Sequence, residues 1–322
     1  MNVPASWLSW ALISVIFATT VPTAETPPVR ILTVDETAVT IALPDAANGY
    51  YRSSRFVWGG MVTQVLWHGH TYFTELKRPH DPLRHDGASG GAEEFGIDDG
   101  GLGYDHAKPG ERFAKIGVGA LTRIDEKEYL FHSPYPIAEV APWIVTDEPN
   151  ALRFVQDYRL NDDWAWHYDI VVRVSADGFA LTRHLDNRGL QRIHTDHYNH
   201  HMFAIDDQPI DGSWTLRLPP DTIPKRPTPA YHMTDGLLTL TGAITNTLWT
   251  DFGWSGDRAS TAMTLTHGTS KTAITISTDS APSKIALYAE KTAICPEPFV
   301  AIDLAPGDGK TWTTTYRFAV TP

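Results

Sequence analysis

Two short segments, far apart in the sequence, carry the side chains best suited to acid–base chemistry. Residues 194–203 read HTDHYNHHMF and residues 295–299 read CPEPF. A histidine and a carboxylate that a fold brings together can move protons between two oxygen atoms, because one group donates while the other accepts. The sequence therefore poses the question of which histidine meets which carboxylate.

The four histidines of the first segment also raise the possibility of a metal site. In a strand over residues 193–203, successive side chains point to opposite faces of the sheet. His194 and His200 then share one face, while His197 and His201 share the other. Two histidines on each face fall short of the three or four protein ligands that zinc requires. We therefore expect neither a metal nor another cofactor.

The elements that must position these segments have the pattern of β-strands. The clearest hairpin covers residues 168–185, where Asp177-Gly178 supplies the strongest short turn signal. Further strands are expected at residues 30–43, 261–268, 271–278, 284–290, 299–304 and 310–320. Strands that recur about every ten residues, without helical periodicity between them, are typical of an antiparallel sandwich or barrel.

The segment between residues 80 and 110 departs from this pattern. It is rich in glycine, aspartate and histidine, and Glu93-Glu94 lies in its middle. Loops of this length inside a compact domain are usually functional or disordered. An ordered strand is expected directly afterwards, at residues 113–122. We therefore interpret the segment as functional, with the choice between Glu93 and Glu94 left open.

Composition limits the class of partner. The chain of 322 residues has 38 acidic and 26 basic side chains and a formal net charge of −12, without a cluster of lysine and arginine. A nucleic acid is therefore not an expected partner. The 11 tryptophans either pack in the core or offer platforms on which sugar rings stack, since indole combines apolar area with a polar edge.

The N-terminus predicts export. Residues 7–20 form an apolar run of signal-peptide length, and small residues up to Ala24 offer a cleavage site. We expect a signal peptide over residues 1–24 and a single β-sandwich domain over residues 25–322. After cleavage the protein would be periplasmic or secreted, without stable membrane association. The alternative is an N-terminal anchor that is retained. Because Cys295 is the only cysteine, no internal disulfide is possible.

The motifs, taken in order, resemble the galactose mutarotase-like superfamily, which includes the aldose 1-epimerases, and within it an uncharacterised bacterial branch. The resemblance covers most of the expected domain and rests on residues 49–56 (GYYRSSRF), 91–96 (GAEEFG), 115–119 (KIGVG), 198–203 (YNHHMF) and Glu297. It implies a large antiparallel β-sandwich, an all-β fold.

The resemblance also implies roles for single residues. His200 matches the acid that protonates the ring oxygen of a sugar, and Glu297 matches the base that takes the proton from the anomeric hydroxyl. Arg55 lies near the position of an arginine that binds sugar hydroxyls. Further candidates for substrate binding are Glu94, Lys115, His197, His201 and Asp251.

Two departures from the family pattern concern the substrate. The histidine-glycine-glycine motif that supplies a second histidine is missing, and the segment with Glu93-Glu94 occupies roughly its place. His201 stands where asparagine or a small residue is usual. Both changes leave the expected fold intact and bear on the choice of sugar and of reaction.

The leading hypothesis is an aldose 1-epimerase that acts on a free sugar or on the end of a glycan. One alternative is a lyase acting on uronic-acid polysaccharides, because Tyr198 beside His197 and His200 could supply a base and an acid for β-elimination. Another is a carbohydrate-binding protein without turnover. The sequence leaves the identity of the sugar and the oligomeric state open.

Overall fold

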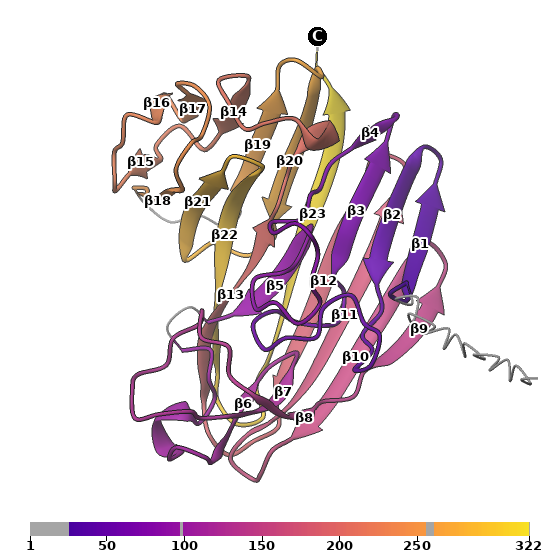
Figure 1. Cartoon of the computed structure of the whole chain (residues 1–322), viewed down its shortest axis with the longest axis vertical. Helices are drawn as coiled ribbons and strands as arrows, with labels where there is room; N and C mark the ends of the chain where they lie inside the picture. Colours follow the sequence, from indigo (N-terminus) through magenta and orange to yellow (C-terminus); the bar gives the residue numbers. More distant parts are fainter. Residues whose placement is uncertain (1–25, 97–98, 256–260, 322) are drawn as a thin grey trace, which may run out of the picture.

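Antiparallel β-sheets make up nearly all of the regular structure (Figure 1). The computed structural model describes residues 26–96, 99–255 and 261–321, so the expected leader at residues 1–24 lies outside the described residues. None of the described residues form a helix with the length and apolar composition that crossing a bilayer requires. Two single 3₁₀ turns, η1 (Tyr104–His106) and η2 (Ile205–Asp207), interrupt the loops.

The larger of two extended sheets has ten strands in the described part of the chain, in the order β16-β17-β14-β19-β20-β23-β12-β11-β10-β9. Their bounds are β16 (Tyr231–Thr234), β17 (Leu237–Leu240), β14 (Trp214–Arg217), β19 (Thr261–His267), β20 (Thr272–Thr278), β23 (Gly309–Val320), β12 (Gly178–Asn187), β11 (Ala165–Ser175), β10 (Ala151–Arg159) and β9 (Ile144–Glu148).

The second extended sheet runs β15-β18-β21-β22-β13-β5 across the described residues. Its strands are β15 (Ile223–Pro224), β18 (Leu248–Gly253), β21 (Lys284–Glu290), β22 (Ala293–Leu304), β13 (Ile193–His201) and β5 (Gly91–Phe95). Two smaller sheets complete the described structure. The first contains β1 (Val29–Val34), β2 (Thr37–Ala42), β3 (Val62–Trp67) and β4 (His70–Thr71). The second contains β6 (Arg112–Lys115), β7 (Gly119–Thr122) and β8 (Ile137–Val140).

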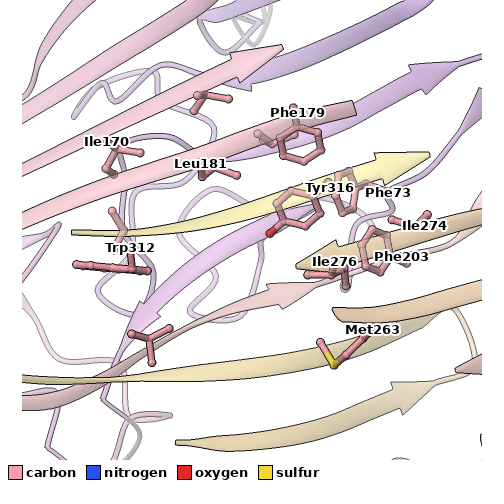
Figure 2. Packing of buried hydrophobic residues seen from close by; sticks show 14 of the residues in the cluster. Phe73, Ile170, Phe179, Leu181, Phe203, Met263, Ile274, Ile276, Trp312 and Tyr316 are labelled. Atoms are coloured by element: carbon pink, nitrogen blue, oxygen red, sulfur yellow. The ribbon is translucent and has the colours of Figure 1, made fainter. Parts of the chain in front are cut away.

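The two extended sheets pack face to face, which confirms the expected all-β sandwich. Trp312 of β23 lies against both Phe95 of β5 and His197 of β13. Figure 2 shows further core side chains between the sheets: Phe73, Ile170, Phe179, Leu181, Phe203, Met263, Ile274, Ile276, Trp312 and Tyr316. Each large apolar side chain buried in this way contributes about 1.5–3 kcal/mol relative to leaving it exposed.

The expected hairpin is confirmed, because Ser175 of β11 pairs with Gly178 of β12 across the Asp177 turn.

Residues 113–122 were expected as one strand, and this prediction is wrong. Gly117 has φ 82° and turns the chain, so that β6 and β7 pair with each other. The segment at residues 30–43 likewise forms the β1–β2 hairpin, where Asp35 has φ 49°.

The proline-rich segment around Glu297 lies inside β22, next to β21 on one side and β13 on the other. Proline donates no hydrogen bond to a neighbouring strand, and it is usually confined to sheet edges or bulges. Here the backbone pairing of β22 with β13 ends at Val300–His197. Beyond it, the His201 ring contacts the Pro296 carbonyl oxygen at 2.5 Å, and backbone pairing resumes between Phe203 and Ile294.

Candidate active site

The alternation of β13 and β5 creates two polar clusters on opposite faces of the six-stranded sheet. Tyr198 pairs with Glu94, and Asn199 pairs with Glu93. Because side chains alternate along a strand, the first pair points away from the ten-stranded sheet and the second points toward it. The outward-facing cluster borders a cavity of about 390 Å³, lined by Arg55, Leu76, Asp86, Phe131, His132, Tyr198, His200, Trp249, Tyr288 and Glu297.

His200 and Glu297 meet at this cavity. The Nδ1 atom of His200 lies 2.7 Å from Oε1 of Glu297, and both side chains are largely buried. Burial alone would lower the pKa of His200, but the negative charges of Glu297 and Glu94 outweigh it and raise this pKa above its ordinary value. The site therefore favours the protonated imidazole of His200 and places it beside the side chain of Glu297, and an acid and a base are the two groups that acid–base catalysis needs.

Glu94 lies directly behind these groups. Its Oε2 atom accepts hydrogen bonds from Tyr198 Oη at 2.6 Å and from Arg55 Nε at 2.9 Å. The same oxygen is 3.2 Å from His200 Nε2. Burial would raise the pKa of Glu94, but Arg55 and His200, with Lys115, lower it to about 2, so the buried side chain is a carboxylate at neutral pH.

Lys115 completes the charged cluster from the side of Glu94 that is remote from the cavity. Its Nζ atom lies 3.7 Å from Oε1 of Glu94 and donates a hydrogen bond to Tyr129 Oη at 2.9 Å. Its side chain is 1% exposed. Burial lowers the pKa of Lys115 to about 8, with Glu94 opposing this shift.

Aromatic rings surround the acid–base pair. Phe131 lies 4.9 Å from the Arg55 guanidinium, and Trp249 pairs with Tyr288 across β18 and β21. All three rings line the cavity, and Trp249 is 38% exposed. Such rings offer flat apolar faces with polar edges, while Trp166, Trp214 and Trp312 are buried in the core. Three tryptophans thus pack in the core, as one of the two expectations had it, while Trp249 lines the cavity.

The same arrangement of sheets occurs in solved structures. The Slr1438 protein from Synechocystis sp. PCC 6803 matches with a TM-score of 0.59 at 14% identity, covering 94% of this chain and 100% of that one. A galactose mutarotase-like protein from Clostridium acetobutylicum gives 0.58 at 12% identity over 92% and 99% of the two chains. The GalM/aldose epimerase homologue from C. elegans gives 0.54 at 12% identity over 92% and 100%.

The chain has the galactose mutarotase-like fold. No family model matches the sequence, and no curated protein matches it either. The likeness is therefore one of fold, at identities too low to transfer an activity. In this galactose mutarotase-like sandwich the cavity lies on the outer face of the six-stranded sheet, and the chemistry has to be argued from its own side chains.

The mutarotase-like fold separates the candidate residues into three groups. His200, Glu297 and Arg55 line the cavity. Glu94 and Lys115 lie behind it, 0% and 1% exposed, and neither is among its lining residues, so they contact the lining side chains rather than the cavity.

The remaining candidates lie elsewhere. His197 and His201 face the ten-stranded sheet, where Trp312 donates to the first and Tyr316 contacts the second. Asp251 forms ion pairs with Lys225 and Arg226 at 3.4 Å each and does not line the cavity. Sequence reasoning did not single out Asp86, Phe131, His132, Trp249 and Tyr288, which come from segments whose position only the folded chain reveals.

The inward-facing cluster predicts acid sensitivity. Burial would raise the pKa of Glu93, but Arg183 and His197 outweigh it and lower it to about 2. Burial lowers the pKa of His197 to about 4 and that of His201 to about 3. Each folded-state pKa lies below the ordinary value, which is 4.5 for glutamate and 6.5 for histidine. In acid the unfolded chain therefore binds more protons at these three residues than the folded chain does.

We therefore expect the contribution of this cluster to stability to be full above pH 6.5 and to fall as the pH drops from 6.5 toward 3, first through the histidines and then through Glu93. Urea unfolding at pH 7, 5 and 4 measures this as a falling midpoint. An unchanged midpoint across this range would contradict the assignment of neutral, buried histidines.

Proposed function

We propose that this protein is a carbohydrate-active isomerase of the aldose 1-epimerase type, which interconverts the anomers of a sugar. The observation that carries the proposal is the contact between His200 and Glu297 at an aromatic-lined cavity. The galactose mutarotase-like fold and its sugar-related neighbours support it.

The chemistry needs one acid and one base at neighbouring oxygens. His200 donates its proton to the ring oxygen O5, while Glu297 takes the proton from the hydroxyl at O1. The C1–O5 bond breaks and the C1–O1 bond becomes a carbonyl, so the sugar opens to its aldehyde. Rotation about the C1–C2 bond and reversal of both proton transfers close the ring as the other anomer. No net proton or electron is consumed, and no covalent intermediate forms.

The close approach of His200 and Glu297 suits this reaction. O1 and O5 are bonded to the same carbon, so the acid and the base that serve them must also lie close together. In the structure the two groups contact each other directly. A bound sugar therefore has to open this ion pair, exchanging it for hydrogen bonds to its own two oxygens.

The elimination alternative receives less support from the same cavity. β-Elimination needs a base that removes a carbon-bound proton, and Tyr198 is the tyrosine beside His200, with 3.1 Å between Oη and Nε2. Burial and the charge of Glu94 raise the pKa of Tyr198 well above 10. The phenol therefore stays protonated at neutral pH and is a poor base.

Polarimetry tests the proposal. Freshly dissolved α-glucose, α-galactose and a uronic acid are followed to anomeric equilibrium with and without the wild-type protein. We expect at least one sugar to reach equilibrium faster in proportion to the protein concentration. If no sugar is accelerated, the isomerase proposal fails. Unsaturated products from a uronic-acid polysaccharide, seen by ultraviolet absorbance, would support the lyase instead.

A further inference from the structure

We propose that Glu94 is a positioning residue, which fixes the orientation of Arg55, Tyr198 and His200 and enables His200 to hold a proton beside Arg55. This inference deepens the proposed function and rests on it for the role of His200. Sequence reasoning placed Glu94 among the substrate-binding residues. Its burial and contacts assign it a different role.

Glu94 cannot contact a sugar from where it lies. Its side chain is 0% exposed, and it is absent from the residues that line the cavity. The three side chains that bond to or contact its Oε2 atom, in contrast, all line the cavity. Glu94 therefore acts on a bound molecule only through these neighbours.

A single oxygen atom organises groups from separate parts of the chain. Arg55 comes from the loop between β2 and β3, and Tyr198 and His200 come from β13. Oε2 of Glu94 lies 2.9, 2.6 and 3.2 Å from Arg55 Nε, Tyr198 Oη and His200 Nε2. Charge-assisted hydrogen bonds of this kind fix direction as well as distance.

The surroundings of His200 Nε2 show why a negative charge is needed there. Nη2 of Arg55 lies 3.1 Å from this nitrogen, and a guanidinium only donates hydrogen bonds. When Nε2 is unprotonated it can accept that bond. When Nε2 carries a proton, two donors face each other, and the proton must point to an acceptor. Glu94 Oε2 and the oxygen of Tyr198 are the acceptors within reach.

Glu94 thus offsets the charge of Arg55 at the moment when His200 is the acid. The charged or titratable groups around His200 are Glu94 on β5, Glu297 on β22, Tyr198 on β13, Arg55 in its loop, and the cavity residues Asp86 and His132. The Nζ atom of Lys115 lies 3.7 Å from the other oxygen of Glu94, so a positive charge flanks each carboxylate oxygen.

The test is an NMR titration of His200 in protein labelled at the imidazole carbons, with the resonance assigned by its loss in His200→Gln. In Glu94→Gln we expect the His200 midpoint to move to lower pH than in the wild type. The turnover number in polarimetry should fall by about 10²-fold, the size of effect expected when a reacting group is misplaced by about 1 Å.

Glu93→Gln is the matched control. It carries the same substitution one residue earlier on β5, and it also removes a buried carboxylate bound to an arginine. It faces the other side of the sheet, so the His200 midpoint should stay at its wild-type value. A midpoint that moves equally in both variants would show a general effect of destabilisation and would overturn the proposal.

A second variant separates the position of the charge from the charge itself. Glu94→Asp keeps the carboxylate but shortens its reach, so the His200 midpoint should stay raised while turnover falls. It also serves if Glu94→Gln does not fold. Unchanged turnover in Glu94→Asp, or an unchanged midpoint in Glu94→Gln, would overturn the proposal. The NMR midpoint does not depend on turnover, so failure of the isomerase proposal remains distinguishable from failure of this one.

Discussion

Replacing Glu297 with glutamine is expected to slow anomer interconversion by about 10²- to 10⁴-fold, the usual contribution of a positioned general base. An amide of the same shape cannot take the proton from O1. The substitution also removes the negative charge 2.7 Å from His200. The pKa of His200 should therefore fall, and less of the acid would be protonated at neutral pH. Both effects act in the same direction.

Polarimetry with the sugar that the wild type accelerates measures this loss. Glu139→Gln is a suitable control, because Glu139 is exposed, pairs with Arg112, and is not among the residues that line the cavity. We expect this control to keep the wild-type rate. Wild-type turnover in Glu297→Gln would show that another group removes the proton, and the assignment of the base would have to be abandoned.

The second large effect concerns stability. Arg183→Met is expected to lower the free energy of unfolding by roughly 3–5 kcal/mol, because removing one partner of a buried ion pair leaves the other charge uncompensated. Arg183 and Glu93 are both 0% exposed, and Arg183 Nε donates to Glu93 Oε1 at 2.7 Å. Arg183 also donates to Asn199 Oδ1, so its loss disturbs β13 as well as β5.

Urea unfolding at pH 7 measures the difference. The double variant Glu93→Gln/Arg183→Met removes both charges, and we expect it to recover part of the loss. Arg153→Met is the surface control, since Arg153 pairs with Asp169 at an exposed position and such pairs contribute about 0–1 kcal/mol. A loss below 1 kcal/mol in Arg183→Met would mean that Glu93 is neutral in the folded protein, against the lowered pKa inferred for it.

Much of the fold follows from local signals. The Asp177-Gly178 turn and the alternation of residues 193–203 predict elements that the structure contains. The lining of the cavity was less accessible, because Phe131 and Trp249 come from segments without a motif, and their meeting depends on the packing of distant strands. Only the second half of β22, at residues 299–304, was expected from the sequence, because Pro296 and Pro298 argue against a sheet interior in the first half. In the fold, the His201 ring contacts the carbonyl of Pro296, and Phe203 pairs with Ile294 next to it.

The choice between the adjacent glutamates could not be made from composition. It depends on the register of β5 against β13, where Glu94 pairs with Tyr198 and Glu93 with Asn199. A shift of one residue would exchange their faces. The sequence shows that two carboxylates are present, while only long-range pairing decides which of them supports the cavity.

This pairing of neighbours on opposite faces also bears on how the protein can change during evolution. Glu93 anchors the sheets to each other, and Glu94 supports the cavity, yet both depend on one five-residue strand. The two roles are therefore coupled, because a shift of one residue in the register of β5 against β13 would move both carboxylates to the wrong side. Substitutions at the rim of the cavity, at Phe131 or Trp249, leave this register untouched, so the lining can change while the strand stays fixed.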